Sequence, residues 1–254
     1  MPDVVSRHKA AWEYDAYAFY AEHNGTPEQL AQKIVADPIK ALRKYAPYFD
    51  ETKGIRVANI CGSIGKKAVP LAMLGAEVTV FDLSRDNCRY ATELATAANV
   101  SLHYEVCDVM TIDPQKYYGT FDVVFMEGGI LHYFHDIDAF LRKMHALLRP
   151  AGRMILSDFH PFTKVCDSLG LEQPTMSYFA SEPFEGEMAH ARFYPEDIRR
   201  SIPTCTYRKY TISEIINSTL SSGFTLTRFD EHPGWKEPTL PGEFTLIAHK
   251  RNER

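Results

Sequence analysis

The most informative part of the sequence is the stretch Val57-Ala58-Asn59-Ile60-Cys61-Gly62-Ser63-Ile64-Gly65. It reads as a short apolar strand, a turn with two glycines, and the approach to a helix. Glycine at such a turn lets the backbone come close to a ligand. The N–H groups at the start of the next helix suit an anion such as a carboxylate or a phosphate. The stretch therefore predicts a strand, turn and helix with a ligand at the turn.

An acidic residue ends the next expected strand. This strand covers residues 77–81, and Asp82 follows it, 17 positions after Gly65. An acid at that place can accept both hydroxyls of a ribose, although it could also only cap the helix that begins near Ser84. Together with the glycine turn, Asp82 predicts a cofactor that contains a nucleoside, bound at the carboxyl ends of parallel strands.

Strands and helices alternate along the middle of the chain. Strands are expected over 55–60, 77–81, 101–106, 121–126 and 153–157, and helices over 66–74, 84–98 and 137–148. A capping box at Thr211 then opens a helix that ends at Gly223, and two strands, 226–230 and 244–249, form an antiparallel pair. The pattern predicts an α/β fold, a doubly wound Rossmann-like sheet of seven strands whose last strand is antiparallel.

Two aromatic segments flank or interrupt this pattern. The N-terminal 52 residues predict three helices: one over 6–22, a second from Thr26-Pro27, and a third from Asp37-Pro38 to about Tyr48. About fifty residues with mixed signals follow the fifth strand, which is long for a connection in an α/β fold. The N-terminal aromatic residues suit a lid, a structural helix or a dimer contact, so a homodimer stays open as an alternative.

The composition favours a soluble cytoplasmic protein. Hydrophobic residues make up 45% of the 254 residues, and the formal net charge of -5 is unlike that of a dedicated nucleic-acid binder. The N-terminus has no apolar segment typical of a signal peptide, and no apolar run is long enough to cross a bilayer. The cysteines are odd in number and without regular spacing, which indicates free thiols: Cys61, Cys88, Cys107, Cys166 and Cys205.

Several motifs in order resemble the class I S-adenosylmethionine (SAM)-dependent methyltransferase family, from about Lys53 to Lys250. The turn lacks the GxGxxG of dinucleotide sites, and the sheet ends in an antiparallel pair. The matching segments are the glycine-rich motif at 57–65, the acid Asp82, Cys107-Asp108-Val109, the fourth strand at 121–127, and the turn Leu147-Leu148-Arg149-Pro150-Ala151-Gly152. The family usually has an acid at the position of Asn59, and glycine at those of Cys61 and Ser63.

The resemblance implies that SAM is the cofactor and S-adenosylhomocysteine (SAH) the product. It implies one domain over 1–254, with a helical lid at 1–52, a SAM-binding half at 53–158, an acceptor cap at 159–210, and a terminal helix and strand pair at 211–254. Asp82 would meet the ribose, and Asp108 the adenine amino group unless it only caps a turn. The full set of expected cofactor-binding residues is Asn59, Cys61, Gly62, Ser63, Gly65, Asp82, Leu83, Asp108, Val109, Glu127 and Gly128.

Methyl transfer from SAM is an in-line displacement, so the protein mainly aligns the reactants and excludes water. A base is needed only if the acceptor arrives protonated. The expected catalytic residues follow the fourth and fifth strands: His132, Tyr133 and His160, with Glu127, His135 and Asp158 as further candidates. His132, His135 and Asp136 are too loosely spaced to predict a metal site.

The favoured function is thus methyl transfer to a small-molecule acceptor. An NAD-dependent oxidoreductase and a non-catalytic SAM-binding module stay as alternatives. Glu127-Gly128-Gly129 follows the fourth strand in place of the Asn/Asp-Pro-Pro-Tyr/Phe motif of amino-methylating DNA enzymes, so a nucleic-acid acceptor is not expected. The aromatic segments favour an enclosed pocket for a partly apolar or aromatic acceptor.

Overall fold

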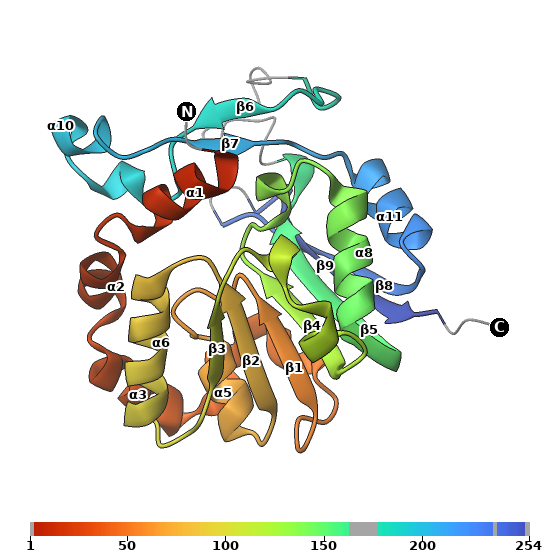
Figure 1. Ribbon diagram of the computed structural model, residues 1–254, viewed down its shortest axis with the longest axis horizontal. Helices are drawn as coiled ribbons and strands as arrows, with labels where there is room; N and C mark the ends of the chain where they lie inside the picture. Colours follow the sequence, from red (N-terminus) through yellow and green to blue (C-terminus); the bar gives the residue numbers. More distant parts are fainter. Residues whose placement is uncertain (1–2, 163–176, 236–237, 252–254) are drawn as a thin grey trace. The chain divides into compact units, whose positions relative to one another are not determined.

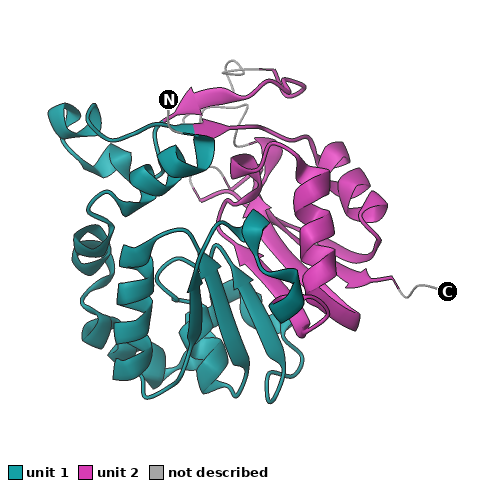
Figure 2. Cartoon of the chain, in the orientation of Figure 1, with its two compact units in different colours: residues 1–116, 187–205 teal, residues 117–186, 206–254 magenta. Residues whose placement is uncertain are grey.

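The computed structural model describes residues 3–162, 177–235 and 238–251 (Figure 1). The strands form a seven-stranded sheet in the order β3-β2-β1-β4-β5-β9-β8, as the alternating pattern predicts. The chain divides into two compact units (Figure 2). Unit 1 comprises residues 1–116 and 187–205, and unit 2 comprises residues 117–186 and 206–254.

Unit 1 contains three parallel strands: β1 (Arg56–Ile60), β2 (Glu77–Asp82) and β3 (His103–Val106). In register, Asn59 lies opposite Val80 and Asp82 lies opposite Val106, so the three carboxyl ends share one edge of the sheet. The helices between them are α5 (Ala68–Met73) and α6 (Arg85–Ala97), and the short turns η2 (Val109–Thr111) and α7 (Pro114–Tyr117) follow β3.

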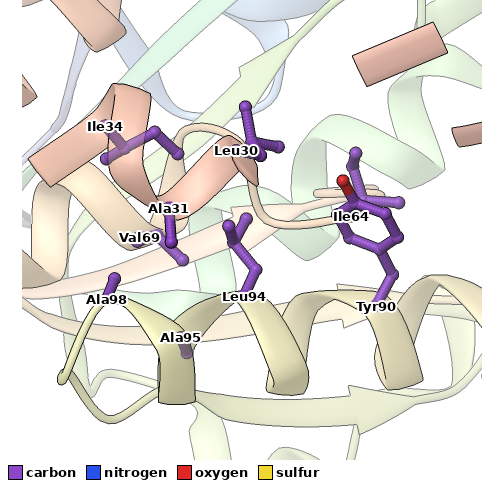
Figure 3. Close-up of a cluster of buried hydrophobic side chains, with 9 residues drawn as sticks. All are labelled: Leu30, Ala31, Ile34, Ile64, Val69, Tyr90, Leu94, Ala95 and Ala98. Carbon is purple, nitrogen blue, oxygen red and sulfur yellow. The ribbon is translucent and has the colours of Figure 1, made fainter. Parts of the chain in front are cut away.

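The N-terminal helices of unit 1 are α1 (Val4–Glu13), α2 (Ala16–Asn24), α3 (Pro27–Ala36) and α4 (Pro38–Leu42), followed by η1 (Arg43–Tyr48). Thr26 and Gln29 form a capping box at the start of α3. The apolar face of α3 packs on α6 in one buried cluster, which Figure 3 shows from Leu30 and Ile34 to Tyr90 and Leu94. This packing makes α3 part of the core of unit 1.

The helix predicted over residues 6–22 is wrong, because the structure has two helices there. The backbone of Asp15 is left-handed, with φ 46°, and it separates α1 from α2. The predicted third helix also changes character: α4 ends at Leu42, and Arg43 has φ 55° before the 3-10 turn η1. The helix expected from Lys66 begins only at Ala68.

Unit 2 contains β4 (Phe121–Glu127) and β5 (Leu148–Phe159), which are parallel and joined by η3 (Leu131–Tyr133) and α8 (Ile137–Leu147). The helix α11 (Ile212–Ser221) precedes β8 (Phe224–Pro233) and β9 (Pro241–Lys250). The strand β9 is antiparallel to both β5 and β8, which confirms the predicted antiparallel pair and leaves β8 at the edge.

The expected long insertion contains short elements. They are β6 (Phe184–Gly186), η4 (Ala191–Phe193), α10 (Glu196–Arg199) and β7 (Cys205–Tyr207), and β6 pairs with β7. Cys166, one of the expected free thiols, lies outside the described residues. Among the helices that the structure describes, none has the length and apolar character needed to cross a membrane.

Candidate functional site

The glycine-rich turn of unit 1 has an unusual backbone. Cys61 and Ser63 are left-handed, with φ 51° and φ 49°, although neither is glycine. Such a conformation costs a non-glycine residue about 1 kcal/mol or more. The neighbouring residues offset this cost at Ser63: its N–H donates to Asp82 Oδ2 at 3.0 Å, its carbonyl accepts from Tyr104 Oη at 2.9 Å, and its hydroxyl donates to Tyr20 Oη at 3.2 Å. The turn is therefore held in one shape.

The two glycines of the turn are required by close packing. A Cβ atom at Gly62 would lie 2.4 Å from Asn59 Oδ1 and 2.8 Å from a methyl group of Val80. Gly65 has φ 75°, and a Cβ there would lie 3.2 Å from Ala91. Asn59 is 1% exposed and packs directly beneath Gly62. The side chain that replaces the family's acid thus supports the turn from inside.

Asp82 ends β2 as a buried carboxylate, and the chain uses three of its lone pairs. Oδ1 accepts from Ser84 N at 3.0 Å and from Asn87 Nδ2 at 3.2 Å, and Oδ2 accepts from Ser63 N. Burial raises the pKa of Asp82, while these hydrogen bonds oppose the shift. Because a carboxylate offers about four lone pairs, one stays available on Oδ2 for a ligand hydroxyl. Leu83, which follows, is half-buried.

Asp108 follows β3 and caps the next turn. Its Oδ1 accepts from Met110 N at 2.9 Å, and its carbonyl accepts from Thr111 N at 2.9 Å. Val109 is 3% exposed. The capping role considered for Asp108 is therefore present, and it uses Oδ1 of the carboxylate.

In unit 2, the loop after β4 is fixed by a carboxylate of β5. Asp158 is 1% exposed, and its Oδ2 accepts from Ile130 N at 2.9 Å and Leu131 N at 2.7 Å. Glu127 ends β4 half-buried. Gly128 and Gly129 are left-handed, and a Cβ at Gly129 would lie 2.3 Å from the Phe159 ring. Asp158 thus orders the loop that carries His132 and Tyr133.

His132 and Tyr133 lie among aromatic rings. The His132 ring is 4.3 Å from that of Tyr133, 5.1 Å from Tyr207 and 6.4 Å from Phe159, between centroids. The His132 carbonyl accepts from Arg208 N at 2.9 Å, which ties the loop to the segment after β7. His135, a further candidate, lies 3.4 Å from the Thr206 carbonyl.

His160 is engaged on both ring nitrogens. Its Nε2 lies 3.0 Å from Glu231 Oε1, and its Nδ1 accepts from Phe162 N at 3.2 Å. Burial lowers the pKa of His160, while Glu231 opposes the shift. This arrangement favours a structural role and leaves His132 and Tyr133 as the better candidates.

Sequence reasoning missed Tyr20, Asn87 and Tyr104, which hold the glycine-rich turn and Asp82. Tyr20 is 43 positions from Ser63, and Tyr104 is 41 positions from it. Asn87 could have been found, because it follows the N-cap Ser84 by three positions. No cluster of three or more metal-ligating side chains occurs in the part of the chain that the structure describes.

Comparisons with known proteins agree with this geometry. Residues 57–152 match the family model for a methyltransferase domain. A ubiquinone biosynthesis O-methyltransferase of Bradyrhizobium diazoefficiens is 33% identical over 104 residues, which are 41% of this chain and 40% of the relative. The chain thus spans less than half the length of that curated relative.

Solved structures resemble the fold over more of the chain. A SAM-dependent methyltransferase from Mesorhizobium loti has a TM-score of 0.61 at 18% identity, covering 81% of this chain and 97% of that one. Magnesium protoporphyrin IX methyltransferase from Synechocystis with bound SAH also has a TM-score of 0.61, at 17% identity. The match covers 98% of this chain and 100% of that one.

The matched segment, residues 57–152, is thus similar to a methyltransferase domain. The whole fold is similar to that of solved SAM-dependent methyltransferases.

Proposed function

We propose that this chain transfers the methyl group of SAM to a small-molecule acceptor. The observation that carries the proposal is the buried Asp82 carboxylate, which keeps one lone pair for a hydroxyl donor beside a glycine-rich turn. Donor hydroxyls on a ribose fit this acceptor. SAM would supply a methyl group that is already activated as a sulfonium, with a neutral thioether as leaving group.

Different residues of unit 1 would bind different parts of the cofactor. Asp82 and Leu83 would bind the ribose, and Asp108 and Val109 the adenine. The turn from Cys61 to Gly65, supported by Asn59, would face the methionine end with its backbone. The N–H groups of Cys61, Ser63 and Gly65 already donate to Phe81, Asp82 and Gly62 within the chain. Glu127 and Gly128, at the end of β4 in unit 2, complete the proposed set.

The acceptor would meet the loop after β4. His132 and Tyr133 carry polar groups among aromatic rings, with Tyr207 5.1 Å and 5.3 Å from their ring centroids. Such a surface suits a small aromatic or partly apolar acceptor. Two similar proteins are named as a ubiquinone biosynthesis O-methyltransferase and a magnesium protoporphyrin IX methyltransferase, which supports an acceptor of that kind. His132 would accept the acceptor's proton where one must leave.

Calorimetric titration with SAH tests the cofactor. We expect micromolar binding to the wild-type protein and at least a ten-fold weaker affinity in Asp82→Asn, because the amide replaces a charged acceptor. Asp86→Asn, the same change on the half-buried start of α6, is the matched control and should bind normally. A thermal melt of each variant shows whether the fold is intact.

Two other outcomes favour the alternatives. Binding of NADH in place of SAH would identify an oxidoreductase. Binding of SAH without turnover of SAM against a panel of phenols, carboxylic acids and amines would favour the non-catalytic module. Turnover that is lost in His132→Ala but kept in His160→Gln would assign the acceptor side to the loop after β4.

A further inference from the structure

His190 lies in a nest of aromatic side chains within unit 1. It precedes η4 and comes from the insertion, while the rings around it come from α1 and α2. The His190 ring stacks on Phe19 at 4.4 Å, and it lies 5.3 Å from Trp12 and 5.9 Å from Tyr20, between centroids. The residue is 4% exposed, so it is buried as deeply as the core of the unit.

One nitrogen of this buried ring is unused. Nε2 of His190 is fully buried and has no hydrogen-bond partner among the described residues. Burial, and to a lesser degree the nearby His23, lowers the pKa of His190 to about 4, so the ring is neutral at pH 7. An unpartnered buried nitrogen is costly and calls for an explanation, which a ligand can provide.

Two other histidines have polar atoms close to their ring nitrogens. Glu231 Oε1 lies 3.0 Å from Nε2 of His160, and Nδ1 of His160 accepts from Phe162 N. His23 also stacks on Phe19, at 4.1 Å, and its Nδ1 lies 2.9 Å from the Phe19 carbonyl. His190 packs as closely as His23 but leaves a polar atom without a partner in the same nest.

His190 is connected to the glycine-rich turn through one side chain. The Tyr20 ring packs edge-on against His190, and the Tyr20 hydroxyl accepts a hydrogen bond from Ser63 Oγ. The turn around Ser63 is the part of unit 1 that would face the methionine end of SAM. Asn59, which packs beneath Gly62 of that turn, carries no charge.

We propose that Nε2 of His190 forms a hydrogen bond with the amino-acid end of SAM. The proposal deepens the proposed function and rests on it. A neutral imidazole suits this place, since it accepts from the ammonium group in one tautomer and donates to the carboxylate in the other. Because the ring is uncharged, it does not repel the positive sulfonium. His190 is then a positioning residue for the cofactor.

The test compares two ligands that differ only at that end. SAH carries the amino-acid group, and methylthioadenosine has the same nucleoside and thioether without it. Calorimetry gives the affinity of each for wild type, His190→Phe and His23→Phe. We expect His190→Phe to bind SAH about ten-fold more weakly or worse, with methylthioadenosine unchanged, because a hydrogen bond to a charged group is lost. The control His23→Phe should bind both ligands normally.

Two results overturn the proposal. An equal loss for both ligands would mean that His190 acts through packing of the nest, and no loss for either would mean that it does not touch the cofactor. If wild type itself binds neither ligand, the proposed function fails, and this is known before any variant is made. Imidazole nitrogen resonances of wild type provide an independent readout: SAH should shift Nε2 of His190, methylthioadenosine should not, and an unmoved resonance contradicts the contact.

Discussion

Ser63 has a left-handed backbone conformation although it is not glycine, and its hydroxyl donates a hydrogen bond to Tyr20 of α2. Glycine would adopt the same φ of 49° without strain. Serine adds something that glycine cannot, a hydrogen bond to Tyr20 Oη at 3.2 Å. The Ser63 side chain therefore connects the N-terminal helices to the glycine-rich turn.

A double-mutant cycle measures that connection. Ser63→Ala and Tyr20→Phe each remove one hydroxyl and should each lower the free energy of unfolding by urea. We expect the double variant to lose about 1 kcal/mol less than the sum of the two single losses. Tyr17→Phe is the matched control, because the Tyr17 hydroxyl bonds Glu93 instead. A coupling energy as large between Ser63 and Tyr17 would refute the direct contact.

For single residues, the sequence predicted interactions between neighbours in the chain and missed interactions between residues far apart in it. Asp82 could be expected from its place after a β-branched strand, and the structure places it at the end of β2. Tyr20, Tyr104 and His190 could not, because their partners lie far along the chain and no spacing marks them. The cofactor roles of all these residues remain predictions.

The loop between β4 and α8 shows how one carboxylate can order a whole element. Asp158 satisfies two backbone N–H groups at the start of η3, and a carboxylate so engaged is a poor candidate for a base. We predict that Asp158→Asn destabilises the protein by about 2 kcal/mol in urea denaturation, because buried N–H groups lose a charged acceptor. Glu127→Gln, at the half-buried end of β4, should change stability by less than about 0.5 kcal/mol. Equal losses of stability in the two variants would mean that the charge on Asp158 does not strengthen its two hydrogen bonds to the backbone.

Most elements could be predicted from their periodicity, and the exceptions have local causes. The helix over 6–22 was expected to be continuous because neither glycine nor proline interrupts it before Asn24. The break occurs at Asp15, one of the few residue types that adopt left-handed geometry without glycine. The capping box of α3 could be predicted, since its hydrogen bonds join residues three positions apart. The sequence offered Asp82 as a possible cap of α6, and the structure has Ser84 in that role.

On the scale of the whole molecule, the compact units do not follow the order of the sequence. Residues 187–205 belong to unit 1, although they follow β5 and β6 of unit 2. Alternating strands and helices predict the sheet, but they hold no information on where an insertion packs. The sequence predicts an acceptor cap in the insertion, and this stays a prediction. Two of its aromatic residues, Phe193 and Tyr194, pack on α2, where their rings lie 5.6 Å and 6.1 Å from Phe19.

The burial of His190 makes the stability of the molecule depend on pH. The pKa of His190 is about 4 in the folded state and 6.5 for an unperturbed histidine, so the unfolded chain binds the proton more tightly. The contribution of His190 to the free energy of unfolding is therefore fully present above pH 6.5. It falls as the pH drops toward 4, by about 2 kcal/mol at pH 5. Asp82, whose pKa is raised, contributes with the opposite sign, since its folded form takes up a proton first.

His190→Phe separates the two contributions, because it removes the histidine and leaves Asp82. We predict that wild type loses about 2 kcal/mol more than the variant between pH 7.5 and pH 5, in urea denaturation followed by tryptophan fluorescence. Trp12 packs on His190, whereas Trp235 is 81% exposed, so the signal reports mainly on unit 1. Because every other titrating group is common to both proteins, an equal loss would show that the imidazole is not buried in its neutral form. A larger loss in wild type would establish the neutral, ligand-ready state of the ring that the contact with the amino-acid end of SAM requires.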